Sequence, residues 1–143
     1  MIGKRIVIAT WVGLGACAVV AIPNALGLHA LDTATAVVCL AVFLLSLPVW
    51  LYAFGLAIVR SARGDDIAVS SWVFLAGSAP ADVRKQLLGA TAVSVLLWAT
   101  AWANPFIVLV SLYPLGMAAL WGARHGTFPA RKIAAPAARG GRR

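Results

Sequence analysis

TAVVCLAVFLLSLPVWLYAFGLAIV, residues 35–59, is the stretch of sequence that decides the fold of this chain. It contains no Asp, Glu, Lys, Arg or His, and it ends at a charged residue, Arg60. About 20 mostly apolar residues are enough for a helix to cross the hydrocarbon core of a bilayer. The stretch therefore predicts a membrane-spanning helix.

Three further apolar runs lie on either side of this stretch, at residues 6–23, 86–103 and 106–121. The first run closes at Pro23-Asn24, a pair that is typical of a helix end. Only Asn104-Pro105 separates the last two runs, so we expect them to form a tight antiparallel hairpin. The four runs predict an all-α fold, an integral membrane four-helix bundle over residues 1–130.

The composition of the 143-residue chain is that of a membrane protein. Hydrophobic residues make up 62% of the chain and charged residues 11%, with a mean hydropathy of +0.93. Soluble domains average about 45–50% apolar and about 25% charged residues. The net charge of +8 would suit a nucleic-acid-binding protein, but the positive residues flank the apolar runs. We therefore expect no nucleic-acid partner.

The positions of the basic residues predict the orientation of the bundle, because the cytoplasmic flanks of membrane spans are enriched in Lys and Arg. All twelve basic residues lie before the first run, between the second and third runs, or after the fourth. They are Lys4, Arg5, Arg60, Arg63, Arg84, Lys85, Arg124, Arg131, Lys132, Arg139, Arg142 and Arg143. Four spans then place both termini and the loop 60–85 in the cytoplasm, and the protein in the plasma membrane.

Two alternatives to four spans stay open. Lys4-Arg5 and Val19-Val20-Ala21 have the features of a cleaved signal peptide, although the run 6–23 exceeds the roughly 7–15 apolar residues of such peptides. Residues 106–121 are short for a span and could form a re-entrant hairpin. A re-entrant hairpin would leave the basic tail outside the cell.

A line of small residues on the first run predicts a close helix contact. Ala9, Gly13, Cys17 and Ala21 recur at every fourth position, which places them on one helix face. Small residues at this spacing let another helix approach closely in a membrane. The partner of this face is either another helix of the same chain or a second subunit.

Two prolines, Pro48 and Pro114, lie inside predicted spans. Each removes a backbone N–H and releases the carbonyl four residues earlier, so we expect a kink in each helix. Most such kinks shape packing, but a released carbonyl can also face an ion or a substrate.

The predicted spans lack the residues of membrane-embedded chemistry. Charged residues persist inside a bilayer mainly where they serve a function, and none of the four runs contains Asp, Glu, Lys, Arg or His. His29 and Asp32 in the loop 24–34 are two candidate ligands, whereas a zinc site needs three or four. No nucleotide-binding, metalloprotease or serine-hydrolase motif is present. We expect no catalytic, cofactor-binding or metal-binding residues, and hence no enzyme.

Two cytoplasmic segments are distinctive. Residues 67–77 are apolar but too short to span, so we expect them to lie in the membrane interface or to cover the inner mouth of the bundle. Residues 131–143 consist largely of Ala, Pro, Gly and Arg, which predicts a disordered tail. Its basic residues predict contact with anionic lipid headgroups, through Arg131, Lys132, Arg139, Arg142 and Arg143.

The stretches VFLAGSAPADVRKQLLGA (73–90) and LWGARHGTFPARK (120–132) resemble segments of small uncharacterised multi-pass membrane proteins of high-GC actinobacteria. This resemblance implies a plasma-membrane location and no particular activity. The sequence favours a non-catalytic accessory or assembly partner of a membrane complex. The expected protein partner is another membrane protein or a further copy of this chain. The alternative is a small oligomeric transporter or channel.

Overall fold

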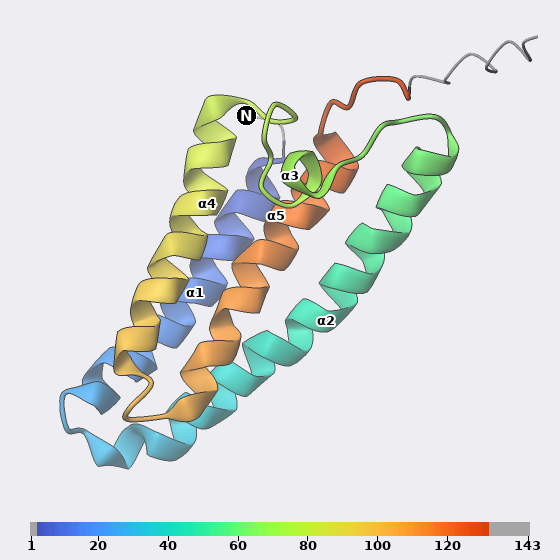
Figure 1. The fold of residues 1–143 in the computed structure, drawn as a ribbon. Helices are drawn as coiled ribbons and strands as arrows, with labels where there is room; N and C mark the ends of the chain where they lie inside the picture. The colour runs from blue at the N-terminus through green and yellow to red at the C-terminus, as the bar shows by residue number, and fades with distance from the viewer. Residues whose placement is uncertain (1–2, 132–143) are drawn as a thin grey trace, which may run out of the picture.

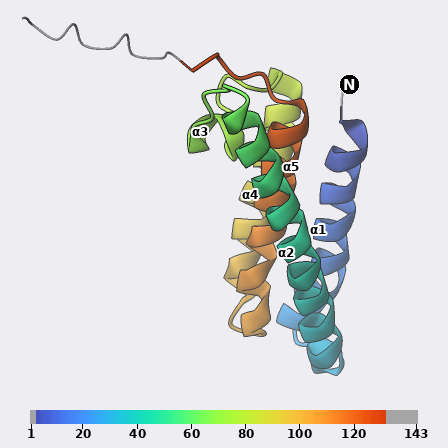
Figure 2. The same ribbon diagram turned by 90° about the vertical axis from the view of Figure 1, so that its right-hand side faces the viewer.

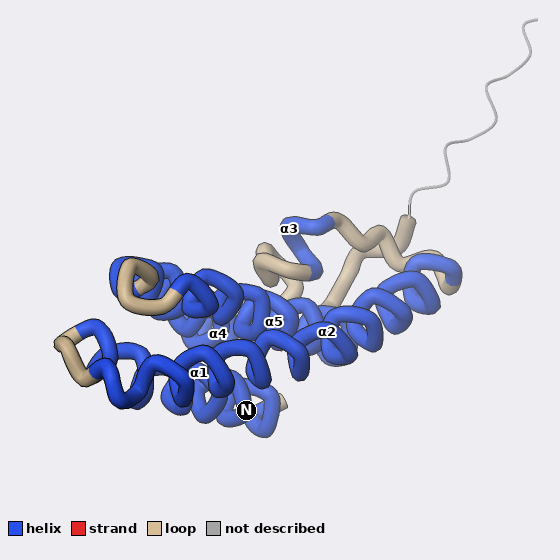
Figure 3. Tube along the Cα trace, turned by 90° about the horizontal axis from the view of Figure 1, so that it is seen from below, coloured by secondary structure: helices blue, strands red, loops and turns tan. Residues whose placement is uncertain are grey.

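The computed structural model describes residues 3–131, and every regular element in that range is helical (Figures 1 and 3). The α-helices are α1 (Lys4–Ala25), α2 (Asp32–Ala62), α3 (Val69–Trp72), α4 (Ala81–Leu96) and α5 (Leu112–His125). The 3-10 segments are η1 (His29–Leu31), η2 (Leu97–Thr100) and η3 (Pro105–Ser111). The predicted all-α class is confirmed. The predicted tail lies outside the described residues, apart from Arg131.

Three helices are long and apolar enough to cross a membrane: Lys4–Ala25, His29–Ala62 and Pro105–His125. They overlap the predicted spans 6–23, 35–59 and 106–121. The predicted span 86–103 matches the helices of the structure less closely than the other three predicted spans do. It corresponds to the second half of α4 and to η2, and its helical residues end at Thr100.

α5 is the central helix of the arrangement and packs against α1, α2 and α4 (Figures 1 and 2). Of the most apolar 18 residues of Pro105–His125, which joins η3 to α5, 67% are buried, against 28% for Lys4–Ala25 and 22% for His29–Ala62. Small residues explain why the neighbours come so close, since Gly116, Ala119 and Gly122 are all buried on α5. α2 diverges from α1 and α4 toward its C-terminal end (Figures 1 and 3).

The two ends of the bundle differ in charge. The start of α1, the segment 63–80 and the segment 126–131 lie at one end (Figure 1). We call it the basic end, because it holds Lys4, Arg5, Arg60, Arg63, Arg84, Lys85, Arg124 and Arg131. The opposite end is formed by the turns at residues 26–31 and 101–104.

The two prolines at which kinks are predicted have different surroundings. α2 runs as one helix from Asp32 to Ala62 with Pro48 inside it. Pro114 instead lies in the first turn of α5, directly after the 3-10 segment η3. A proline is tolerated there because first-turn N–H groups have no partner within an α-helix. Pro114 therefore lies beside a junction between a 3-10 helix and an α-helix.

Candidate functional site

The small-residue face of α1 is occupied by α5 of the same chain. A Cβ added at Gly13 would overlap the Tyr113 ring and lie 2.8 Å from its Cζ atom. The Tyr113 hydroxyl donates a hydrogen bond of 2.8 Å to the carbonyl oxygen of Ala9. The absence of a side chain at Gly13 therefore leaves room for the Tyr113 ring. The Ala9 carbonyl, one turn away, accepts the hydrogen bond from the Tyr113 hydroxyl.

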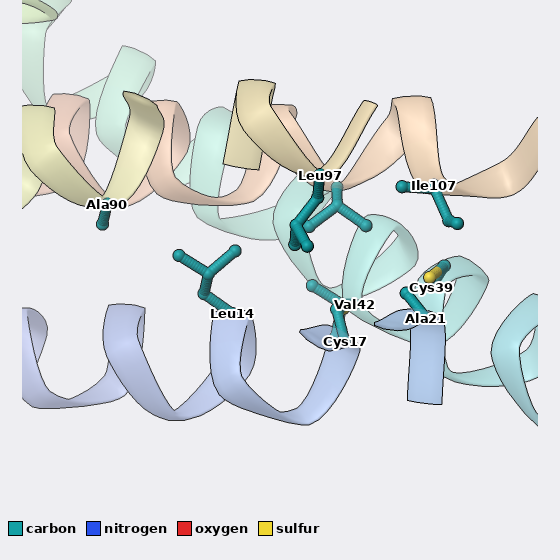
Figure 4. Packing of buried hydrophobic residues seen from close by; sticks show 9 residues of the cluster. Leu14, Cys17, Ala21, Cys39, Val42, Ala90, Leu97 and Ile107 are labelled. Carbon is teal, nitrogen blue, oxygen red and sulfur yellow. The ribbon is translucent and has the colours of Figure 1, made fainter. Parts of the chain in front are cut away.

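The rest of this face packs against α2 and the last hairpin (Figure 4). Cys17 and Ala21 are fully buried, in one cluster with Cys39 of α2 and Ile107 of η3. Both cysteines are free thiols. The structure thus brings Gly13, Cys17 and Ala21 to helix contacts within the chain.

A second strip of small residues, on α5, receives two tryptophans. A Cβ at Gly116 would lie 2.8 Å from Nε1 of Trp50, and this indole nitrogen donates to the Leu112 carbonyl oxygen at 2.9 Å. The Trp72 indole donates to the Ala119 carbonyl oxygen at 2.8 Å. The Trp50 and Trp72 rings meet edge to face, with centroids 6.3 Å apart. Sequence reasoning missed both anchors, because each tryptophan lies far along the chain from the residues of α5 that it contacts.

Trp72 belongs to residues 67–77, which we call the cover segment. The backbone of Trp72 packs so closely on α5 that a Cβ at Gly122 would clash with its carbonyl oxygen. Leu75 is fully buried and adopts a left-handed conformation, with φ of +56°, which a leucine rarely takes. Phe74 is half exposed. The cover segment therefore packs over the basic end of α5, with Phe74 facing outward.

Arg60 joins the end of α2 to the end of α5. Its Nε atom lies 2.7 Å from the Asp65 carboxylate, and its Nη1 atom donates to the carbonyl oxygens of Ala123 (3.1 Å) and Gly126 (2.9 Å). The guanidinium also stacks over the Phe128 ring, 4.7 Å from its centroid. A cation at these carbonyls compensates the negative end of the α5 dipole.

After α5, residues 126–131 run beside the turn that follows α2 and are hydrogen-bonded to it. The Asp66 N–H donates to the Pro129 carbonyl at 2.8 Å, and the Arg131 N–H donates to the Gly64 carbonyl at 2.7 Å. The Arg131 side chain donates to the Ser61 hydroxyl at 2.7 Å. Of the predicted lipid-contacting residues, Arg131 is thus tied to this turn. The others, Lys132, Arg139, Arg142 and Arg143, lie outside the described residues.

At the opposite end, Asp32 connects three segments. Its carboxylate accepts a hydrogen bond of 2.6 Å from the Asn24 amide, and its carbonyl accepts one of 3.1 Å from the Asn104 amide. His29 lies 4.0 Å from the same carboxylate and is 77% exposed. The arrangement fixes the ends of α1, α2 and the last hairpin. Sequence reasoning paired His29 with Asp32 but missed Asn104.

Across residues 3–131, no group of three or more His, Cys, Asp or Glu side chains is placed to hold a metal ion. Compared with protein families, curated proteins and solved structures, the chain matches none. What the described residues define is a class: an all-α protein with three helices long and apolar enough to cross a membrane.

Proposed function

We propose that the protein is an integral four-helix bundle of the plasma membrane, in which α4 with η2 forms the fourth span. Together these two segments cover residues 81–100, about 30 Å of helix at roughly 1.5 Å per residue. They pack against α1, α5 and η3 along the bundle. The charged residues Asp82, Arg84 and Lys85 lie in the first turns of α4, where the helix would leave the hydrocarbon core.

The orientation that we propose places both termini and the loop 60–85 in the cytoplasm. Its support is that the eight basic residues of the described range all lie at the basic end, because cytoplasmic flanks carry the excess of Lys and Arg. The tail 131–143 would then rest on anionic lipid, where each basic residue contributes about 1 kcal/mol. A synthetic 131–143 peptide should bind anionic vesicles at low salt and ignore zwitterionic ones.

For the activity we propose a non-catalytic accessory or assembly role in a membrane complex. The observation that carries this proposal is the nature of the bundle centre. Leu14, Cys17, Cys39 and Leu97 close it with apolar contacts (Figure 4), and no predicted span contains Asp, Glu, Lys, Arg or His. Charged side chains inside a bilayer generally mark transport or catalysis. Much of the apolar surface of α1 and α2 remains exposed for lipid or for a protein partner.

The alternative, a small oligomeric transporter or channel, is favoured by one observation. The junction between η3 and α5 interrupts a span near its middle, and discontinuous helices often line transporter sites. Against this function, Val110, whose carbonyl Pro114 releases, is fully buried in the apolar cluster with Leu14 and Ile107.

Co-purification from native membranes in mild detergent tests the accessory role. We compare the wild type with a Leu45→Ala, Leu51→Ala variant on the exposed face of α2, and with a matched Val12→Ala, Val19→Ala variant on the exposed face of α1. The accessory role predicts a stoichiometric membrane protein that is lost with one pair and kept with the other. Recovery of a homo-oligomer alone would favour the transporter or channel instead.

A further inference from the structure

We propose that the basic end carries a binding site for the phosphate group of one anionic phospholipid, between the start of α1 and the end of α5. A cavity of about 360 Å³ lies there, lined by Gly3, Lys4, Arg5, Ile6, Arg124 and His125. This inference rests on the proposed membrane bundle, because the bundle brings the cavity to the level of the lipid headgroups.

The charge of the lining is the first argument. Lys4, Arg5 and Arg124 contribute three positive charges, and no carboxylate lines the cavity. Within residues 3–131 the ion pairs are Arg60–Asp65 and His29–Asp32, so these three cations belong to neither. A phosphate in the cavity would accept charge-assisted hydrogen bonds from these cations.

The helix ends supply the second argument. α1 begins at the cavity with no side-chain cap and no acidic residue in its first turn, so its positive end is uncompensated. At the end of α5 the situation is reversed, because Arg60 already bonds the Ala123 and Gly126 carbonyls. Arg124 is therefore not needed to cap α5, and its guanidinium can bind an external anion.

Close packing shapes the wall of the cavity in advance. Gly3 takes a left-handed conformation, with φ of +71°, and a Cβ there would lie 2.7 Å from Trp121 Cδ1 and 3.0 Å from His125 Cδ2. The start of α1 is therefore seated directly on α5. A preformed site binds its ligand with less ordering cost than a mobile one.

The position of the cavity points to a lipid rather than to a soluble phosphate. Ile6 forms part of the lining, and Ile8, one helical turn along α1 from the lining residue Lys4, is half exposed. A phospholipid could place its phosphate among the cations and its acyl chains along this apolar face. Basic pockets between membrane helices on the cytoplasmic side bind anionic headgroups in this way.

The test compares two variants that each lose three positive charges from the same end. The cavity variant is Lys4→Gln, Arg5→Gln, Arg124→Gln, and Arg124→Gln alone serves as a milder form in case the triple variant unfolds. The matched control is Arg63→Gln, Arg84→Gln, Lys85→Gln, whose residues are exposed and do not line the cavity. Each purified protein is titrated in detergent with phosphatidylglycerol or phosphatidylcholine, and bound lipid is counted by native mass spectrometry.

We expect the wild type and the control to retain one phosphatidylglycerol per chain and to prefer it to phosphatidylcholine. The cavity variant and Arg124→Gln should bind it at least about tenfold more weakly. Equal weakening in the control, or full retention in both cavity variants, would overturn the proposal. Displacement of the lipid by millimolar inorganic phosphate would assign the site to a soluble anion and overturn it as well.

A separate readout distinguishes failure of this site from failure of the membrane bundle. Cell fractions are extracted with alkaline carbonate, which leaves integral proteins in the membrane pellet. The cavity variants should stay in the pellet while they lose the lipid. Appearance of the wild type in the soluble fraction would instead contradict the membrane bundle itself.

Discussion

At the residue scale, Gly13 and Tyr113 hold α1 against α5. A Gly13→Leu change would drive the new side chain into the Tyr113 ring and break its hydrogen bond to Ala9. Overpacking of this kind costs about 1–3 kcal/mol, and lipid offers no compensating gain. We expect a lower melting temperature of the purified protein in detergent, measured by thermal unfolding.

Two variants control this experiment. Val19→Leu enlarges a residue of α1 that is 72% exposed, so it should leave the melting temperature unchanged. Tyr113→Ala removes the ring that Gly13→Leu would displace. The double variant Gly13→Leu, Tyr113→Ala should therefore lose less stability than the two single variants lose together. If Gly13→Leu left the melting temperature as unchanged as Val19→Leu does, the close contact between Gly13 and Tyr113 would be contradicted.

The residue scale also shows how far the sequence leads. The four-residue spacing of Ala9, Gly13, Cys17 and Ala21 predicts a face for close packing, because spacing is a local property of a helix. The sequence does not identify Tyr113 as what fills it. That residue is 100 positions away in the chain, and its place depends on how the helices are arranged in space.

At the element scale, the cover segment depends on a glycine of α5. Gly122→Ala would place a methyl group against the Trp72 carbonyl oxygen, so the cover segment would have to shift. We expect faster amide hydrogen exchange in residues 67–77, and a net loss of about 1–3 kcal/mol in stability. Mass spectrometry of the exchanged peptides measures the first effect.

Glycines with open space around them give the matched control. A Cβ at Gly55 of α2 or at Gly89 of α4 meets no atom within 4 Å. Alanine at either position should therefore keep the exchange of residues 67–77 unchanged and stabilise its helix by about 0.5–1 kcal/mol. Equal exchange in Gly122→Ala and Gly89→Ala would show that the cover segment does not rest on α5.

Arg60 also connects two elements, because its side chain joins the end of α2 to the end of α5. We call these contacts the Arg60 clasp. Arg60→Gln removes the ion pair with Asp65 and the bonds to the Ala123 and Gly126 carbonyls. We expect residues 126–131 to loosen, and trypsin to cut after Arg124 and Arg131 several times faster in detergent. The control is Arg63→Gln, at an exposed position. Trypsin should cut this variant after Arg124 and Arg131 at the wild-type rate. Unchanged cleavage in Arg60→Gln would contradict the clasp.

The apolar runs predict where the long helices lie, because burial in lipid demands a continuous apolar stretch. They do not predict the 3-10 segments η2 and η3, which lie on either side of the turn at 101–104. Asn104 itself caps η3, accepting a bond of 3.2 Å from the Phe106 N–H. The two tryptophan anchors and the Arg60 clasp join distant parts of the chain, so no local pattern signals them.

At the scale of the whole molecule, the central claim is that four helices cross the membrane with both termini inside. α4 is the decisive element, since it is not among the helices that meet the length and composition of a span by themselves. If α4 crosses, the turn at 101–104 and the cover segment lie on opposite sides of the membrane. If it does not, they lie on the same side.

Labelling of single cysteines in intact cells with a membrane-impermeant maleimide tests this claim most directly. The background is Cys17→Ala, Cys39→Ala, which removes the two native thiols. His29→Cys and Trp102→Cys, both at strongly exposed positions of the opposite end, should be labelled from outside. Ser70→Cys and Ala137→Cys should be labelled only after the cells are permeabilised. Labelling of Ser70→Cys or Ala137→Cys in intact cells, or protection of Trp102→Cys until permeabilisation, would contradict the four-span bundle.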